Sequence, residues 1–462
     1  MVNELRELMR EATDRPPQDT ADLHALVRTG RRRLRVRRAT QVGASALAAG
    51  AIGMASGMAS TSWVNPSPPD LASAGVPRAE GPTIRLSEAS PAVEGEHYRE
   101  LTSYTNEDLE SDNGEYFDGV TDDGLILFRE AQTMTRREAR FALMDPATGE
   151  KEWLPDLPGA DNQSRAVELS TERLVLMRFE TSDDASSPTG MARRPVLDVY
   201  DRAAAAWRTI GWPTLPANDS PSFVQIGPDG RAYVALVSDP GNVPEGGWPM
   251  GPDGEADDSD AEGEVRALWS MSLTEPADAR DEGMQVGAFA FDDDDRLVWT
   301  DSTNGAAGRV HVRDLDSGEE TSFDPGLGER CNLLGFDVAG GRIAMSQYCG
   351  TYDDGVRDDR VQVVTTEGEP VITVQDSGAE GGDWVAGGDF LTVTAYDRAT
   401  AGMYVYDFEK ERLLRLSEGH SPWSAGQGPT PGDHLMWTTP AGSKHPEFGR
   451  SGATVHLGEL IR

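Results

Sequence analysis

Short runs of alternating hydrophobic and polar residues, broken by Gly and Asp turns, recur from residue 83 to residue 462. One kind of run predicts two strands joined by such a turn, as in 223–237 and 336–345. A second kind follows it, a strand that ends at an Asp turn before a short closing strand, as in 141–153 and 310–321. Period-two alternation with these turn residues is typical of β-hairpins. Two hairpins per repeat predict a four-stranded sheet.

The repeat length favours one architecture. Repeats of roughly 40–50 residues with four strands each are typical of β-propeller blades. We therefore expect an all-β domain, a β-propeller of about seven four-stranded blades, with six or eight blades as alternatives. The expected blades are 115–157, 165–214, 222–277, 286–325, 331–375, 382–417 and 421–462.

The last expected blade lacks a closing strand after Thr454–Leu457. Thr83–Leu86 lies before the first blade and is predicted to supply the missing strand from the other end of the domain. Such a closure would remove the open sheet edges that otherwise promote aggregation.

The first 82 residues follow a different pattern. Residues 1–38 hold two short stretches of helical periodicity separated by Pro16–Pro17, which predicts a short helical segment. Residues 39–64 carry no charged side chain, are rich in Ala and Gly, and predict one transmembrane helix. Residues 65–82 form a Pro, Ala and Ser linker. The predicted β-propeller occupies residues 83–462.

The distribution of charge sets the expected topology. The chain has a formal net charge of −37, yet residues 1–40 hold ten Arg and only six acids. Arginines just before the apolar stretch favour a cytoplasmic N-terminus. The acidic C-terminal domain is then extracytoplasmic, on a single-pass cell-membrane protein, and so acidic a domain excludes nucleic acid as a partner. The topology-setting arginines are Arg31, Arg32, Arg33, Arg35, Arg37 and Arg38.

The apolar stretch admits two interpretations. Ala46, Gly50, Gly53 and Gly57 share one helix face, and such small residues favour close pairing of two transmembrane helices. The alternative to a retained anchor is a cleaved twin-arginine signal, whose apolar region is also weak and rich in Gly. Both interpretations place the C-terminal domain outside the cytoplasm.

The chain has two cysteines, Cys331 and Cys349, both in the expected fifth blade. If the turn near residue 340 contains three residues, the two cysteines face each other on adjacent strands. We expect a disulfide bond between them in an oxidising compartment, and two buried free thiols are the alternative.

No catalytic, metal-binding or cofactor motif is recognisable. Asp292–Asp295 and the acidic run 251–263 do not match the EF-hand pattern and are expected to be solvated. His420, His434, His445 and His456 lie in the last expected blade without the spacing of a zinc site. We therefore predict no cofactor. The tryptophans, among them Trp153, Trp207, Trp269, Trp299 and Trp437, are expected in the blade cores.

The repeats resemble WD-repeat-type or Tol-Pal-type propellers, although the Trp-Asp dipeptide of the former is absent. The layout with an Arg-rich stop and one crossing resembles bacterial single-pass proteins that carry an extracytoplasmic propeller. Some of these bind extracytoplasmic-function sigma factors through their cytoplasmic N-terminus, which would imply a protein partner there. The zinc motif of zinc anti-sigma proteins is missing, since residues 1–38 hold His24 and no Cys.

Two functions remain open, and a scaffold or envelope protein without a ligand is a third possibility. The first is a membrane-anchored propeller that binds an unknown extracytoplasmic protein or small ligand, with a regulatory role through its N-terminus. The alternative is an extracytoplasmic enzyme, of hydrolase or lyase type, with its site in the propeller channel. Residues from different blades can meet there without leaving a local sequence motif.

Overall fold

The protein is represented by a computed structural model. It describes residues 81–461, apart from residues 107–112, 133–138, 161–163, 184–190, 219, 240, 242–263, 302–307, 327–330, 352–356, 377–378, 385–387, 397–398, 420–427, 433 and 445–450.

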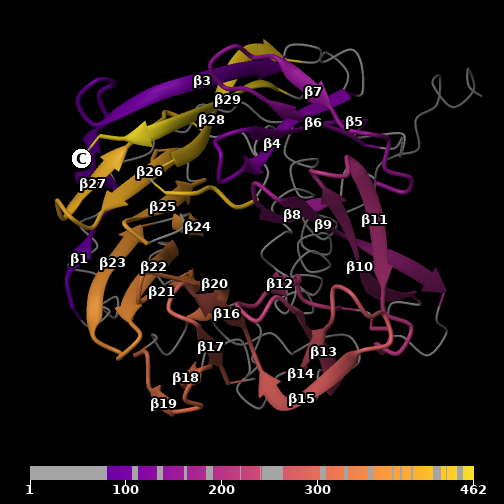
Figure 1. Cartoon of the computed structure of the whole chain (residues 1–462). Coiled ribbons are helices and arrows are strands. Elements are labelled where there is room, and N and C mark those ends of the chain that lie inside the picture. The colour runs from indigo at the N-terminus through magenta and orange to yellow at the C-terminus, as the bar shows by residue number, and fades with distance from the viewer. Residues whose placement is uncertain are drawn as a thin grey trace, which may run out of the picture. The chain divides into compact units, whose positions relative to one another are not determined.

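The described residues of the C-terminal domain form seven β-sheets arranged around a centre as the blades of a β-propeller (Figure 1). Within each of the first six blades the first strand lies nearest the centre and the later strands follow outward in chain order. The predicted all-β fold and the count of seven blades are therefore confirmed.

The first four blades are four-stranded and antiparallel, as predicted. Their strands are β4 (Asn113–Val120), β5 (Ile126–Gln132), β6 (Arg140–Met144) and β7 (Lys151–Trp153) in blade one; β8 (Arg165–Leu169), β9 (Arg173–Asp183), β10 (Met191–Asp201) and β11 (Ala206–Gly211) in blade two; β12 (Gln225–Ile226), β13 (Ala232–Asp239), β14 (Val265–Met271) and β15 (Ala279–Val286) in blade three; and β16 (Phe289–Asp292), β17 (Arg296–Thr300), β18 (Val310–Asp314) and β19 (Glu320–Phe323) in blade four.

In the described residues, blades five and six each gain a fifth strand from the N-terminal segment of the domain, whereas blade seven has two strands of its own and a third from that segment. Their own strands are β20 (Asn332–Ala339), β21 (Arg342–Thr351), β22 (Arg357–Thr365) and β23 (Pro370–Asp376) in blade five; β24 (Ala379–Trp384), β25 (Phe390–Ala395), β26 (Gly402–Asp407) and β27 (Arg412–Arg415) in blade six; and β28 (His434–Lys444) and β29 (Ser451–Leu460) in blade seven.

The ring is closed by a strand that the sequence analysis did not select. β3 (Tyr98–Asn106) pairs antiparallel with β29 and becomes the outer strand of blade seven. Thr83–Leu86, the predicted closing strand, lies elsewhere: β1 (Thr83–Ile84) pairs parallel with β23 of blade five. The prediction that the N-terminal end supplies the closing strand is correct, but the predicted residues are wrong.

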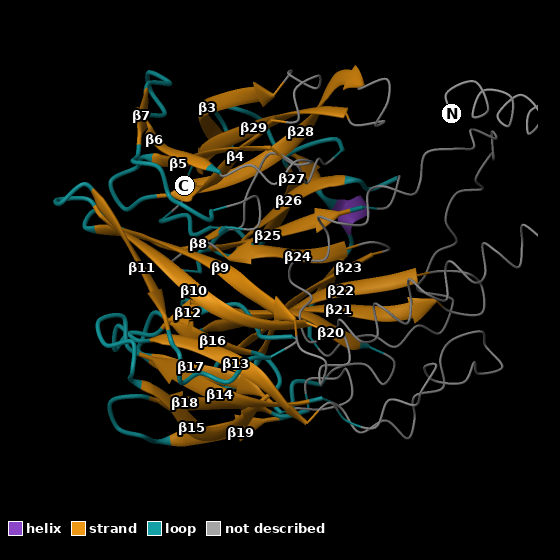
Figure 2. Cartoon of the chain, turned by 90° about the vertical axis from the view of Figure 1, so that its right-hand side faces the viewer, coloured by secondary structure: helices purple, strands orange, loops and turns teal. Residues whose placement is uncertain are grey.

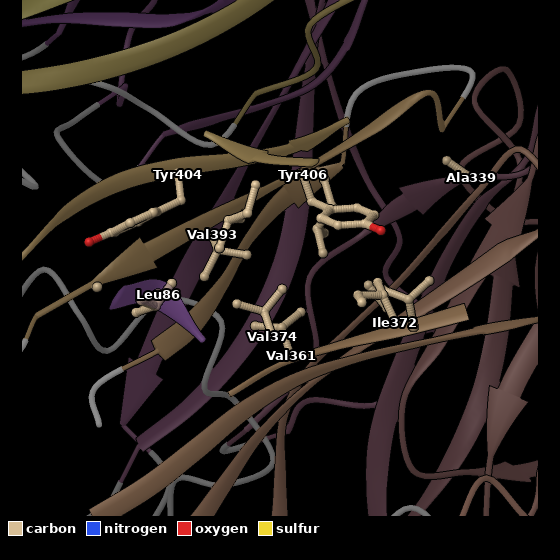
Figure 3. Close-up of a cluster of buried hydrophobic side chains, with 13 residues drawn as sticks. Leu86, Ala339, Val361, Ile372, Val374, Val393, Tyr404 and Tyr406 are labelled. Carbon is tan, nitrogen blue, oxygen red and sulfur yellow. The ribbon is translucent and has the colours of Figure 1, made fainter. Parts of the chain in front are cut away.

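The segment from Thr83 to Asn106 therefore forms a strap across three consecutive blades. After β1 comes a short 3-10 helix (Leu86–Glu88), and β2 (Ser90–Pro91) then pairs parallel with β27 of blade six. Leu86 is buried between blades five and six, against a cluster that includes Val374, Val393 and Tyr404 (Figure 3). This burial fixes the strap to the ring before β3 reaches blade seven.

The predicted Asp turns are present and lie on one side of the ring. The carboxylates of Asp145, Asp314 and Asp407 accept hydrogen bonds from backbone N–H groups of their own turns, between the third and fourth strands. Figure 2 shows described turns (teal) of this kind gathered at one end of the strands. These aspartates thus satisfy turn backbone groups, as Asp commonly does.

One predicted solvated acid is buried instead. Asp292 is almost inaccessible, forms an ion pair with Arg296 at 3.1 Å, and accepts a hydrogen bond from Gly341 N of blade five. The prediction of a solvated cluster at Asp292–Asp295 is therefore wrong for its first member, because the turn packs against the next blade.

The predicted features of residues 1–80 lie outside the described residues. These features are the helical segment, the transmembrane helix with its pairing face, and the arginines before it. Within the described part of the chain, no helix has the length and apolar character needed to cross a bilayer.

The hairpin of blade five shows how the two cysteines are arranged. Ala339 lies opposite Arg342, so the turn contains Gly340 and Gly341 and is one residue shorter than we assumed. An irregularity between Leu333 and Gly335 compensates, and Asn332 then lies opposite Tyr348. Cys331, which directly precedes Asn332, is buried. The side chain of Cys349 lies outside the described residues, so the disulfide bond stays a prediction.

Candidate functional site

The three described strands of blade seven hold a hydrogen-bonded cluster centred on His456. Trp437 of β28 lies directly opposite His456 of β29, and their rings stack with centroids 4.9 Å apart and an interplanar angle of 7°. Glu100 Oε2 lies 3.0 Å from His456 Nδ1, and Thr439 Oγ1 lies 2.9 Å from His456 Nε2. A carboxylate, an imidazole and a hydroxyl are thus joined in series. We call these four residues the blade-seven cluster.

A β-bulge brings Glu100 to the imidazole. Leu457 pairs with Thr102, but the next residue, Gly458, pairs with Glu100, so Leu101 is the extra residue on β3. Because side chains alternate between the two faces of a strand, one inserted residue moves the preceding side chains to the opposite face. Leu101 packs toward blade one, whereas Tyr98 packs against Trp437 toward blade six. Glu100 therefore shares the face of His456.

The hydrogen-bond partners fix the tautomer of His456. An ionised carboxylate can only accept, so Glu100 requires a hydrogen on Nδ1. The neutral ring then has a lone pair on Nε2, which accepts the hydrogen bond from the Thr439 hydroxyl. His456 has a side-chain exposure of 16% and Glu100 one of 30%. The cluster is thus partly shielded and still reachable from solvent.

Blade four contains an equivalent cluster with one decisive change. Trp299 of β17 lies opposite His311 of β18 and stacks on it with centroids 5.0 Å apart. Asp301 occupies the position of Thr439, two residues after the Trp, and its Oδ1 lies 2.8 Å from His311 Nε2. Glu320 of β19 occupies the position of Glu100 but lies 3.6 Å from Nδ1. We call these residues the blade-four cluster.

The two imidazoles therefore differ at Nε2: this nitrogen accepts a hydrogen bond in His456 and donates one in His311. Asp301 accepts, so His311 carries its hydrogen on Nε2, and no hydroxyl is bound to the ring in this cluster. Burial works to raise the pKa of Asp301, but hydrogen bonds from Arg309 N and from His311 outweigh it and lower that pKa. Asp301 thus stays ionised and holds the imidazole ring in place. The blade-four cluster therefore has a structural role.

The repeated cluster has a signal in the sequence that we did not use. Trp299-Thr-Asp301 is followed by Val310-His311, and Trp437-Thr-Thr439 is followed by Val455-His456. Aligning these two segments would have placed each His beside its Trp. The sequence analysis treated His456 as an isolated packed or surface residue, whereas the structure joins it to Glu100, which lies 356 positions away in the chain.

A buried ion pair joins the first two strands of blade one. Arg129 of β5 donates hydrogen bonds to both carboxylate oxygens of Asp118 on β4, and its guanidinium lies 4.2 Å from the ring centroid of Tyr116. Both charged side chains are buried. Both partners belong to blade one, and removal of either would leave an uncompensated buried charge.

The other residues singled out in the sequence are the tryptophans and the histidines of the last blade. Trp299 and Trp437 are buried as expected, but Trp153 has an exposed fraction of 39%, so its prediction as core is wrong. His434 lies 3.4 Å from Glu459, while His420 and His445 lie outside the described residues. Across the described ranges, no group of three or more His, Cys, Asp and Glu side chains is arranged to hold a metal ion.

No family model and no curated protein matches the chain. Among solved structures it is similar to an oligogalacturonate lyase in complex with manganese, at 11% identity over 81% of this chain and 99% of that one, with a TM-score of 0.46. It is also similar to a streptogramin B lyase, at 11% identity over 79% of this chain and 98% of that one, with a TM-score of 0.37.

A similarity to a prolyl endopeptidase has 13% identity and a TM-score of 0.41, and covers 77% of this chain. The chain spans less than half the length of that protein, 45%. Similarities this weak give no information on function, which depends on the residues of this chain.

Proposed function

We propose that the protein is a membrane-tethered propeller that binds a ligand outside the cytoplasm. The observation that carries this proposal is the difference between the two faces of the ring. On one face the turns are short and their aspartates are used internally, as at Asp145 and Asp314. Toward the other face, the ends of the second and third strands of each blade are separated by longer stretches of sequence, and residues 240–264 are the longest of these stretches.

Described side chains at that second face can contact a ligand. Arg165 begins the inner strand β8, and its guanidinium lies 4.5 Å from the ring centroid of Phe223. Tyr396, which follows β25, has an exposed fraction of 44%. Aromatic and Arg side chains contribute strongly to binding surfaces. Loops positioned on a rigid scaffold commonly carry such functions.

The ligand-binding proposal is tested by shortening one connection. Residues 240–264 are replaced by a short Gly-Ser turn in the full chain, and binding of labelled cell-envelope oligosaccharides and peptides is measured by fluorescence anisotropy. A substitution in the opposite-face turn, Asp229→Ser, is the control. We expect weaker binding only in the shortened variant, at an unchanged melting temperature. Equal binding by both variants, or no binding by the unaltered chain, would contradict the proposal.

A regulatory role of residues 1–38 is part of this proposal. It rests on the layout of the sequence, in which an Arg-rich segment of predicted helical periodicity precedes the apolar stretch. Affinity capture with the full chain and with a chain that lacks residues 1–38 tests it. We expect a cytosolic partner with the full chain alone, and recovery of the same proteins by both chains would remove the regulatory role.

A second function, an extracytoplasmic hydrolase, is favoured by the blade-seven cluster. A hydroxyl bound to an imidazole that a carboxylate orients is the arrangement of an activated nucleophile. The cluster lies across the described strands β28, β29 and β3 of blade seven, whereas our sequence hypothesis placed the enzyme site in the channel. Hydrolysis of p-nitrophenyl acetate by the full chain, above the rate of a heat-unfolded sample, tests this function.

A further inference from the structure

We propose that Thr439 is the nucleophile of an esterase site on blade seven, with His456 as its general base and Glu100 as a positioning residue. This inference rests on the second of the proposed functions and assigns its site and its substrate class. The substrate class is an O-acyl ester of a neutral, hydroxyl-bearing molecule, such as an acylated sugar.

The geometry of the three groups supports the assignment. Thr439 Oγ1 is 2.9 Å from His456 Nε2, within the distance over which a base removes a proton. Glu100 Oε2 is 3.0 Å from Nδ1 and keeps the hydrogen on that nitrogen, so that the lone pair of Nε2 faces the hydroxyl. Stacking on Trp437 restricts rotation of the imidazole ring. The base is therefore held in the required orientation before any substrate binds.

The comparison within the chain isolates what is special about blade seven. The blade-four cluster keeps the Trp, the His and the Glu but has Asp301 where Thr439 stands. A carboxylate on Nε2 makes the imidazole a donor, so it cannot serve as a base there. The side chain at this position, Asp301 or Thr439, thus distinguishes the two clusters. Only the blade-seven cluster has a hydroxyl hydrogen-bonded to an imidazole that can act as its base.

The surface around Thr439 suits a neutral hydroxylated substrate. Thr454 lies opposite Thr439 on β29, and Thr105 lies opposite Thr454 on β3, so three threonines form one row across the sheet. The hydroxyls of Thr105 and Thr454 are 2.8 Å apart. Hydroxyl groups can both donate to and accept from sugar hydroxyls. The formal net charge of −37 disfavours acidic substrates.

The reaction requires only water besides the ester. Thr439 Oγ1 bonds to the acyl carbon as its proton passes to His456 Nε2. The carbon–oxygen bond of the ester then breaks, and the alcohol leaves with that proton. A water molecule gives a proton to the same nitrogen as it attacks the acyl-threonine, which releases the acid and restores the hydroxyl.

The test uses the full chain, p-nitrophenyl acetate and a fluorophosphonate probe. We expect the probe to add to Thr439, located by peptide mass mapping, and turnover to fall about 100-fold or more in Thr439→Val, which keeps the shape of the side chain without the hydroxyl. Glu100→Gln should lower turnover by a similar factor because the amide can donate to Nδ1 and reverse the tautomer. Thr439→Ser should retain activity and thereby show that the site tolerates substitution.

The blade-four cluster supplies the matched control, and the outcomes are distinct. Asp301→Asn and His311→Gln should leave turnover unchanged. Turnover with labelling at another residue, or turnover unaffected by Thr439→Val, would overturn the assignment of the site while leaving the hydrolase function intact. No turnover and no labelling of the unaltered chain would overturn both. The labelled residue is located in the unaltered chain, so this result does not depend on whether a variant folds.

Discussion

Glu100 Oε2 and His456 Nδ1 lie 3.0 Å apart although 356 positions separate the two residues in the chain. The contact exists because β3 closes blade seven beside β29, and because the bulge at Leu101 turns Glu100 toward the imidazole. Closure of the ring and assembly of the blade-seven cluster are thus one structural event. Changes in the strap should therefore affect both stability and the cluster.

Removing the strap should open the ring. A chain that begins at residue 107 lacks Tyr98, Leu101 and Tyr104, which pack in blade seven and its neighbours. These three side chains are partly buried, and Leu86, which is fully buried, is lost as well. Complete burial of a large apolar side chain stabilises a protein by about 1.5–3 kcal/mol. At about 2–4 °C per kcal/mol, we expect the melting temperature to fall by roughly 10 °C or more. The exposed edge of β29 should also promote association.

The control for this prediction is a chain that begins at residue 81, which keeps the whole strap. Its melting temperature and its sedimentation should match those of the full chain in the same detergent. A chain from residue 107 that melts at the same temperature as this control would show that β3 is dispensable.

The ion pair of Asp118 and Arg129 should be the most sensitive polar contact near the centre of the ring. Both side chains are buried, so Asp118→Asn leaves the charge of Arg129 without its carboxylate. Loss of one partner of a buried pair costs about 3–5 kcal/mol. Urea unfolding measures this cost. Arg99→Ala is the matched control, since the Arg99 side chain is 65% exposed and its pair with Glu459 should contribute little.

Acid should weaken the contact between blades one and two. Both guanidinium nitrogens Nη1 and Nη2 of Arg202 lie 2.8 Å from the carboxylate of Asp123, and this hydrogen bonding lowers the pKa of Asp123 to about 2 from 3.8. A lowered pKa in the folded state means stabilisation that is present above the unfolded value and is lost as the pH falls toward 2. The melting temperature of Asp123→Asn should therefore approach that of the unaltered chain between pH 4 and pH 2, and a constant difference would contradict the account.

The cysteines of blade five should form the predicted disulfide bond in an oxidising compartment. Asn332 and Tyr348 are directly opposite, so the next pair outward is Cys331 and Cys349. Intact mass should rise by two hydrogens on reduction, and reduction should lower stability by about 3 kcal/mol on the loop-entropy model. Alkylation of both thiols without prior reduction would contradict this prediction. The double substitution Cys331→Ser with Cys349→Ser should melt at the temperature of the reduced protein.

The blades could be predicted from the sequence because their signals are local. Alternation and turn residues lie within one hairpin, so the boundaries expected for blade two, 165–214, enclose β8 through β11. The strand partner of β3 could not be predicted in this way. Tyr98–Asn106 alternates no better than Thr83–Leu86, and only the three-dimensional ring decides which of them reaches β29.

The candidate site could not be predicted from local sequence patterns either, because its residues come together only when the ring closes. Glu100 joins His456 through the closure and through a bulge that no turn residue marks. The Trp–His pairs could have been found, because Trp437 and His456 repeat the order of Trp299 and His311 in the chain. The turn of blade five was misjudged by one residue, and a compensating irregularity near Leu333 restored the expected register.

The most direct test of the central claim, closure of blade seven by β3, is a designed cross-link. Thr105 and Thr454 lie opposite each other with their hydroxyls 2.8 Å apart. The account predicts that Thr105→Cys with Thr454→Cys forms a disulfide bond, seen as a linked peptide pair after proteolysis. A linked pair from Thr83→Cys with Thr454→Cys, and none from Thr105→Cys with Thr454→Cys, would contradict it.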